Sequence, residues 1–214
     1  MSQPPAPQQV ASLDDVVARA RDLAARPGRT VLGITGPPGA GKSTLTDLVL
    51  PALGEVAGHL PMDGFHLADV QLDRLGNRDR KGAPDTFDVG GYVAALRRLG
   101  EAPDDVLYAP GFERELEQPI AAAIAIEPTA RFVVTEGNYL LHDRDGWEHV
   151  APLLAETWYV DVDPTVRVER LVARHVRFGK SPDEARAWVE RSDEANARLV
   201  ATTRARADVV VELG

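Results

Sequence analysis

The chain has 214 residues, 44% of them hydrophobic and 27% charged, a size that suits one well-packed domain better than two. It contains no cysteine, which excludes disulfides, cysteine-bound metals and a thiol nucleophile. The formal net charge of -9 argues against nucleic acid as the main partner, because phosphate-backbone binding needs a broad positive surface.

The N-terminal residues 1–11 are rich in Pro and Gln and predict a disordered tail, which leaves residues 12–214 as a single domain. They lack the basic start and apolar stretch of a signal peptide, and no later run is long enough to span a membrane. We therefore expect a cytoplasmic protein without a membrane partner. Apolar residues at helical spacing then predict a helix from Leu13 to Ala24, with Ser12 as its N-cap.

Short β-branched or apolar segments recur along the rest of the chain, at residues 31–35, 57–62, 105–108, 132–135, 157–162 and 208–212. Helical patterns separate most of them. Such alternation predicts an α/β fold of three layers, with a mostly parallel sheet flanked by helices.

The most informative stretch is residues 31–50, VLGITGPPGAGKSTLTDLVL, in which a strand-like run and a helix-like run flank a glycine-rich turn. The turn fits the pattern GxxxxGK(S/T), whose backbone N–H groups converge on phosphate oxygens. Lys42 can reach the terminal phosphates and Ser43 can bind Mg²⁺. The turn therefore predicts a P-loop for a nucleoside triphosphate, bound by Gly36, Gly39, Ala40, Gly41, Lys42, Ser43 and Thr44.

A P-loop alone does not separate a kinase from a GTPase or an ATPase motor. A GTPase is expected to carry an Asn-Lys-x-Asp motif, and none of the three lysines, at 42, 81 and 180, lies in one. The GTPase hypothesis is therefore disfavoured.

The segment HLPMDGFHL places Asp63 at the end of the second predicted strand, where ligands gather in an open α/β sheet. Phosphoryl transfer to an alcohol benefits from a carboxylate that accepts the hydroxyl proton, and Asp63 is our candidate for this base. The alternative is a turn formed by Asp63 and Gly64 without a catalytic role. The buried strand 132–135 ends at Glu136, where a carboxylate can support Mg²⁺ opposite Ser43.

A helix predicted from Asp163 onward carries arginines 167, 170, 174 and 177 along one stripe. The stripe leads into a glycine turn and a second helix, which Ser181 and Glu184 start as a capping box. A charged stripe is usually a solvated face of a helix, and for Arg167 we predict only such a face. Arginines beside a hinged helical pair favour a lid over phosphates at residues 170–190, with Arg174 and Arg177 nearest the turn.

Together these segments resemble the uridine kinase, phosphoribulokinase and bacterial pantothenate kinase group of P-loop kinases, from about residue 30 to the C-terminus. GPPGAGKSTL is similar to their ATP loop, MDGFH to the segment with the catalytic Asp, KGAPDTFD to a substrate loop, and TEGNYLL to a Mg²⁺-supporting strand end. The set looks closest to the nucleoside or nucleotide kinase-like subfamily, also called sugar-transport-associated kinases.

The resemblance implies ATP and Mg²⁺ as cofactors, Asp63 as base and Asp85 as a contact to substrate hydroxyls. The segment LYAPGFERELEQP keeps Tyr108 and Arg114 but has no histidine, a departure from uridine kinases. We expect the acceptor to bind within residues 63–115, where the substrate candidates are Asp63, His66, Arg80, Lys81, Asp85, Tyr108 and Arg114. The alternatives are surface salt bridges for the charged residues, Arg80 above all, and a structural loop histidine for His66.

The sequence thus predicts an ATP- and Mg²⁺-dependent kinase that phosphorylates a hydroxyl of a small metabolite, such as a nucleoside, a pantothenate-like compound or a sugar. The catalytic candidates are Asp63, Lys42, Arg174 and Arg177. The alternative is a nucleotide-dependent switch or accessory ATPase without a phosphorylated acceptor. Dimerisation is common among such kinases, so a homodimer is a further expectation. We assign Trp147, Trp158 and Trp188 to packing.

Overall fold

A computed structural model describes residues 6–102 and 104–212. Its main sheet is parallel throughout, with the strand order β1-β8-β7-β2-β6-β3. The strands are β1 (Gln8–Val10), β2 (Thr30–Thr35), β3 (Ala57–Pro61), β6 (Phe132–Gly137), β7 (Glu156–Asp161) and β8 (Val209–Glu212). The predicted α/β fold with a mostly parallel sheet is confirmed.

Side chains of the central strands alternate between two hydrophobic cores, one on each face of the sheet. On β2, Leu32 and Ile34 pack into one core and Val31 into the other. On β6, Phe132 and Val134 face the first core and Val133 the second. Helices must therefore cover both faces, which is the three-layer arrangement that the strand pattern predicts.

The helices are α1 (Leu13–Ala24), α2 (Lys42–Leu53), α3 (Asp69–Leu75), α4 (Val89–Glu101), α5 (Pro164–Arg177), α6 (Pro182–Trp188) and α7 (Glu194–Ala201). Helices α1 and α2 contribute Val16, Ala20, Leu45 and Val49 to one core, and α4 contributes Tyr92 and Leu96 to the other. Among the described residues, none of these helices is long and apolar enough to cross a membrane.

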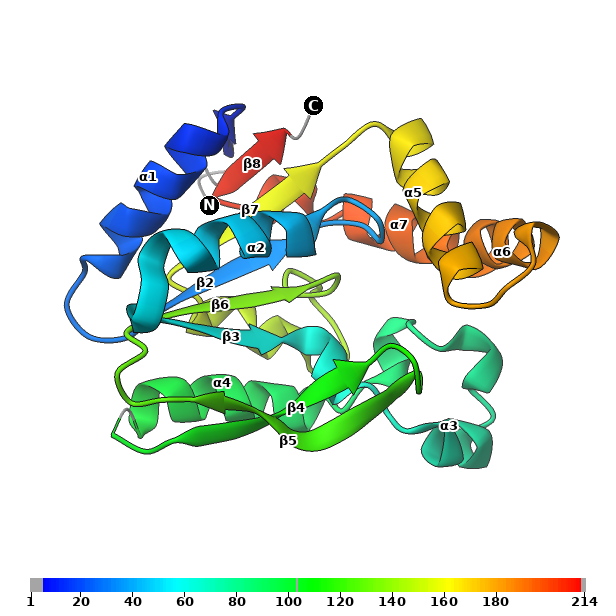
Figure 1. Cartoon of the computed structure of the whole chain (residues 1–214), viewed down its shortest axis with the longest axis horizontal. Helices are drawn as coiled ribbons and strands as arrows, with labels where there is room; N and C mark the ends of the chain where they lie inside the picture. The colour runs from blue at the N-terminus through cyan, green and yellow to red at the C-terminus, as the bar shows by residue number, and fades with distance from the viewer. Residues whose placement is uncertain (1–5, 103, 213–214) are drawn as a thin grey trace.

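Residues 107–126 form a separate antiparallel hairpin, β4 (Leu107–Glu113) and β5 (Gln118–Ile126), and do not join the main sheet. The hairpin lies beyond β3 and beside α4 (Figure 1). The sequence predicted a short strand at 105–108 but gave no indication of β5, whose run of alanines has low β-propensity. The hairpin matters for the site because it packs against η2 (Met62–Phe65), the turn that carries Asp63.

The prediction of a disordered tail over residues 1–11 is wrong for residues 8–10, which form the edge strand β1 beside β8. Pairing uses backbone groups, which the polar composition of this segment does not reveal, and Val10 is buried in the core. Residues 1–5 lie outside the described part of the chain.

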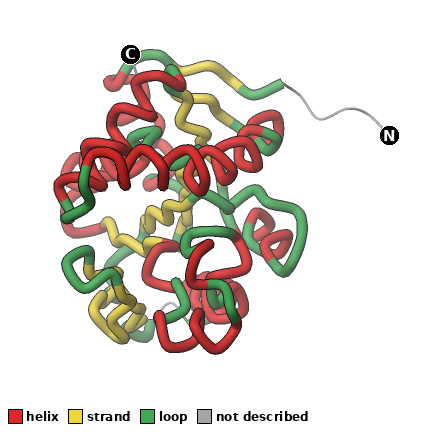
Figure 2. The backbone as a smooth tube through the Cα atoms, turned by 90° about the vertical axis from the view of Figure 1, so that its right-hand side faces the viewer, coloured by secondary structure: helices red, strands yellow, loops and turns green. Residues whose placement is uncertain are grey.

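The carboxyl ends of the parallel strands all point to one edge of the molecule, on the right of Figure 1, where α5, α6 and α3 also lie. Figure 2 faces this edge and shows helices and loops gathered there. Ligands of open α/β sheets bind outside the carboxyl ends of the strands, so this edge is where a functional site is expected.

Candidate active site

The P-loop connects β2 to α2 at this edge and owes its shape to glycines. Gly41, the N-cap of α2, has a φ of 97°, and Gly39 has a φ of 78°. A Cβ on Gly39 would lie 2.8 Å from the Leu171 side chain, so the loop packs directly against α5. Only glycine adopts these conformations at low cost, and they direct backbone N–H groups toward a common point.

Lys42, the first residue of α2, lies folded over the P-loop. Its Nζ donates hydrogen bonds to the carbonyl oxygens of Gly36 and Pro37, each at 3.0 Å, and to Oδ1 of Asn138 at 2.7 Å. Burial lowers the pKa of Lys42 to about 8, against the opposing effect of the Glu136 and Asp63 carboxylates. The ammonium group is therefore held at the point where the terminal phosphates of a nucleotide would arrive.

Ser43 and Glu136 meet across the same edge, on α2 and at the end of β6. Ser43 Oγ donates to Glu136, with 3.1 Å to each carboxylate oxygen. His59 on β3 brings its Nε2 to 3.7 Å from Glu136 Oε1. Burial raises the pKa of Glu136, while the positive charge of Lys42 opposes this shift.

These oxygen donors fit the Mg²⁺ that a P-loop nucleotide brings with it. Mg²⁺ is usually held by one or two protein oxygens together with phosphates and waters. A hydroxyl and a carboxylate 3.1 Å apart match that pattern. Within residues 6–102 and 104–212, no group of three or more His, Cys, Asp or Glu side chains offers a metal site made by protein alone.

Asp63 lies on η2, two residues after the end of β3, and pairs with Arg114 from the turn of the β4–β5 hairpin. The distance between Asp63 Oδ2 and Arg114 Nη2 is 2.5 Å. The turn fits tightly against the hairpin, because a Cβ on Gly64 would lie 2.0 Å from the carbonyl oxygen of Pro110. Burial raises the pKa of Asp63, but His66, Arg114 and Lys42 outweigh burial and leave this pKa below its ordinary value.

His66 follows the same turn, between two aromatic rings. The ring centroids of Phe87 and Phe112 lie 4.0 Å and 4.8 Å from the centroid of its imidazole. Its Nδ1 lies 2.7 Å from the backbone oxygen of Asp63. The ring is therefore held rigidly next to the proposed base.

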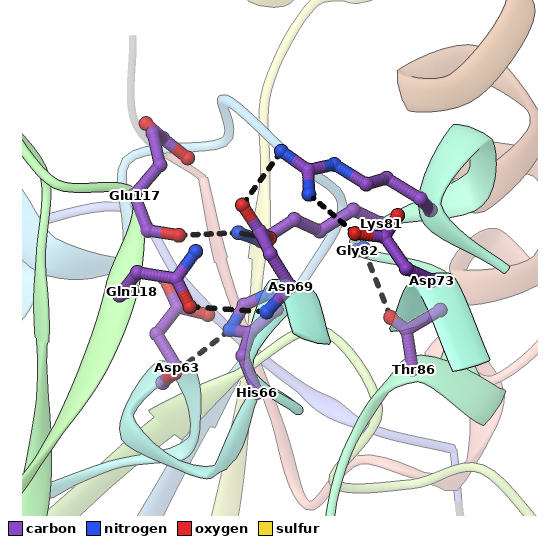
Figure 3. A network of polar contacts seen from close by, with 10 residues as sticks. Asp63, His66, Asp69, Asp73, Lys81, Gly82, Thr86, Glu117 and Gln118 are labelled. Atoms are coloured by element: carbon purple, nitrogen blue, oxygen red, sulfur yellow. Dashed lines mark hydrogen bonds and ion pairs between the residues drawn. The ribbon is translucent and has the colours of Figure 1, made fainter. Parts of the chain in front are cut away.

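The loop after α3 is tied to the hairpin by a polar network (Figure 3). Lys81 donates to Asp69 Oδ1 at 2.7 Å and to the backbone oxygen of Glu117. Asp69 also pairs with Arg78 at 2.8 Å, and its backbone N–H donates to Gln118. Lys81 thus links α3 to the turn of the hairpin, and it also lines the cleft described next.

A cleft of about 1410 Å³ runs along this edge. It exceeds the usual 300 to 1,000 Å³ of a small-molecule pocket, so it has room for two ligands. Its lining includes the P-loop and Glu136 as well as Asp63, His66 and Arg114. Phosphate-binding groups and the proposed base therefore face one continuous space.

The lid arginines do not all face the cleft. Arg174 lines it, and so does Arg170, which was not among the predicted site residues. Arg177 is not part of the described lining, and its guanidinium lies 5.8 Å from the centroid of the Phe178 ring. The capping box of Ser181 and Glu184 is confirmed by both of its hydrogen bonds.

Arg167 is buried, contrary to its interpretation as part of a solvated face. Its side chain donates to the backbone oxygen of Pro38 in the P-loop at 3.3 Å and pairs with Glu194. Arg167 lies about one turn before Arg170 on α5. At this turn α5 packs against the P-loop and α7. It is therefore a structural contact of the P-loop.

A π-helix, η7 (Val189–Asp193), leads into α7 and brings three polar side chains to three parts of the site. Asp193 Oδ2 lies 2.8 Å from His175 Nε2 on α5. Glu194 holds Arg167, and Asn196 donates to the backbone oxygen of Gly82 at 3.3 Å. Sequence reasoning missed Asn196, because its spacing fits no motif.

Three predicted substrate residues lie outside the described lining of the cleft. Arg80 and Asp85 pair with each other on the exposed loop, and Tyr108 is 64% exposed on β4. Trp188, which we assigned to packing, lines the cleft between the cationic groups of Lys180 and Arg191. Asn138 was also missed, although it directly follows the EG motif that identified Glu136.

Comparisons with known proteins agree with this geometry. No family model matches the chain. It is 33% identical over 214 residues to a Schizosaccharomyces pombe protein named "putative uridine kinase", covering 95% of the chain and 91% of that protein. It is 35% identical over 158 residues to an "ATP-dependent kinase-like protein" of Aspergillus versicolor, covering 71% and 87%. Among solved structures, a "putative fructose transport system kinase" of Silicibacter superposes with a TM-score of 0.83 at 33% identity, covering 93% and 98%.

Proposed function

The chain belongs to the family of P-loop kinases related to uridine kinase, and from that premise we propose that it transfers the γ-phosphoryl group of ATP to a hydroxyl of a small metabolite. One observation carries the proposal. Lys42, Asp63 and Glu136, from three different elements, face one cleft that is large enough for both ATP and an acceptor. A nucleotide switch phosphorylates no acceptor and therefore needs no base for an acceptor hydroxyl.

In this proposal ATP binds with its phosphates on the P-loop, over residues 39–44 and the Lys42 ammonium. Lys42 now uses its three donors on Gly36, Pro37 and Asn138, so at least one of these hydrogen bonds must be replaced by one to a phosphate. Ser43 and Glu136 hold Mg²⁺, which neutralises phosphate charge when it is bound. Arg174, together with Arg170 rather than Arg177, approaches the phosphates from α5 and excludes water.

The acceptor occupies the other part of the cleft, next to Asp63. Its hydroxyl donates to the Asp63 carboxylate, which receives the proton as the oxygen attacks the γ-phosphorus in line. Arg114 must move away from Asp63 Oδ2 or share it with the acceptor. The names of the relatives point to a nucleoside such as uridine or to a sugar, and a pantothenate-like compound is a third candidate.

The test is ADP release with Mg-ATP across a panel of nucleosides, pantothenate and simple sugars, for the wild type and Asp63→Asn. We expect one class of acceptor to stimulate turnover, and the substitution to lower kcat by about 100- to 10,000-fold. Direct binding of ATP should persist in the variant, because the hydrogen bonds of Asp63 among the described residues go to Arg114 and His66 and none goes to the P-loop. Asp105→Asn, an exposed change on the loop before β4, is the matched control.

Turnover that ignores every acceptor and survives Asp63→Asn would contradict the proposal. That result would favour a nucleotide-dependent switch or accessory ATPase.

A further inference from the structure

The turn that carries Asp63 holds a second polar side chain in the same orientation. η2 spans Met62–Phe65, and His66 is its C-cap residue. A 3₁₀ turn has about three residues per turn, so side chains at i and i+3 lie on the same side. Asp63 and His66 both line the cleft, and Figure 3 shows them next to each other. Any acceptor that reaches Asp63 must therefore also approach His66.

The hydrogen bond of His66 fixes its tautomer. Its Nδ1 lies 2.7 Å from the backbone oxygen of Asp63, and a carbonyl oxygen only accepts, so Nδ1 carries the proton. Burial lowers the pKa of His66 by more than the Asp63 carboxylate raises it, with Lys81 and Arg114 adding to the lowering. At neutral pH the ring is then a neutral imidazole whose Nε2 presents a lone pair, and it carries the charge that lowers the pKa of Asp63 only at more acidic pH.

That lone pair is accessible, on a ring that belongs to the lining of the cleft. Nε2 of His66 has no protein hydrogen-bond partner among the described residues. The buried polar side-chain atoms without a partner in that part of the chain are Thr46 Oγ1 and His59 Nε2, so Nε2 of His66 is not sealed from solvent. Phe87 and Phe112 pack on the ring and keep its direction fixed.

We propose that Asp63 and His66 form a two-point hydrogen-bond acceptor that selects polyhydroxylated substrates. This inference rests on the proposed kinase function. Asp63 accepts from the reacting hydroxyl, and His66 Nε2 accepts from a second hydroxyl of the same molecule. A sugar, a polyol or the ribose of a nucleoside satisfies both points. A mono-alcohol leaves Nε2 without a hydrogen-bond partner. A carboxylate or phosphate at this position would find the lone pair of Nε2 and no donor, so it cannot form a hydrogen bond there.

The tautomer can be observed directly by long-range ¹H–¹⁵N NMR of the ¹⁵N-labelled protein at pH 7, with His66→Phe identifying the signal. We expect a protonated Nδ1 and an unprotonated Nε2. An Nε2-protonated tautomer, or an imidazolium, would overturn the proposal, because either form donates to the acceptor instead of accepting from it.

The selectivity is tested with matched acceptors that differ by one hydroxyl, such as uridine and 3′-deoxyuridine or a sugar and its deoxy analogue. His66→Phe keeps a ring between Phe87 and Phe112 and should lower kcat/KM for the full acceptor by about 10- to 100-fold. The deoxy acceptor should change by less than about threefold, since its contact to Nε2 is already missing. His66→Gln should keep more activity than His66→Phe, because its amide oxygen can accept.

The outcomes separate this inference from the kinase function. If His66→Phe lowers kcat/KM equally for both acceptors, or for neither, then His66 accepts no hydrogen bond from a substrate hydroxyl. That result leaves the proposed kinase function intact. ATP turnover that is independent of every phosphate acceptor would contradict the kinase function. It would therefore also contradict the proposed pair of hydrogen-bond acceptors, Asp63 and His66. His149→Phe, on an exposed turn outside the described lining of the cleft, is the control for replacing an imidazole.

Discussion

Asp63 and Arg114 form an ion pair inside the cleft, with 2.5 Å between Oδ2 and Nη2, and this pair joins the proposed base to the hairpin. The two residues are 51 positions apart in the sequence, and the approach of η2 to β4 brings them together. In the free protein the pair helps to lower the pKa of the Asp63 carboxyl, and it occupies the oxygen that the proposed acceptor would need.

Replacing Arg114 should therefore change the pH dependence of the reaction. The charge and hydrogen bond of Arg114 help to lower the pKa of Asp63, so Arg114→Gln should raise that pKa. A base works only when it is deprotonated, and activity is lost as pH falls through its pKa. The acidic limb of the kcat/KM profile should therefore move to higher pH, by about one unit or more. Arg74→Gln, on the exposed side of α3, serves as the control, and an unmoved acidic limb would contradict the assignment.

ATP binding should take up a proton at alkaline pH. The pKa of Lys42 in the free protein is about 8, and phosphates next to the ammonium will raise it. The affinity for ATP should be highest below pH 8. As the pH rises further, this affinity should fall by up to about tenfold per pH unit. Calorimetry at pH 8.5 in buffers of different ionisation enthalpy measures this uptake. Lys42→Met should abolish it, and a wild-type binding heat that is the same in every buffer would refute the prediction.

Arg167 should matter for stability, because it is a buried charge that holds the P-loop. Arg167→Leu leaves Glu194 and the Pro38 carbonyl without their donor, and the free energy of unfolding should fall by about 3 kcal/mol. Arg170→Leu on the same helix is exposed and should change it by less than about 0.5 kcal/mol. Urea denaturation followed by circular dichroism compares the two, and equal effects would argue against this role for Arg167.

Asn196 should affect the acceptor more than ATP. It donates to the Gly82 carbonyl, which also accepts from Tyr139 at 2.5 Å, and so helps to hold the loop after α3. Asn196→Ala should raise the acceptor KM by about three- to tenfold, the effect of one lost hydrogen bond. The dissociation constant of ATP should stay within about twofold. If ATP affinity falls by the same factor as acceptor affinity, Asn196 supports the whole cleft and not this loop.

The sequence predicted most of the main sheet, because its strands are short apolar runs and both faces of the sheet are buried. The prediction from sequence missed the strands whose pairing depends on backbone groups alone. The polar residues Gln8 and Gln9 pair with β8, and the alanines of β5 pair with β4, without any period in hydrophobicity that marks a strand.

Motifs with a fixed spacing located the site residues best. Lys42, Ser43, Asp63 and Glu136 all line the cleft, since each lies at or beyond the carboxyl end of a parallel strand and these ends share one edge of the sheet. Residues chosen from charged loops, from the helical arginine stripe or from the resemblance to a substrate loop agreed less well with the lining of the cleft. Arg80, Asp85 and Arg177 depend on loop and rotamer geometry that no pattern encodes, and they lie outside the described lining.

The pairing of β1 with β8 has a consequence for how the protein folds during synthesis. Gln8 lies opposite Val209, a separation of about 200 residues. While the chain is still being translated, β1 has no partner until residues 209–211 have left the ribosome. Contacts so distant in sequence form slowly, because the intervening chain must close first. This edge of the sheet should therefore be the last part of the molecule to form, after the P-loop and its neighbouring strands have folded.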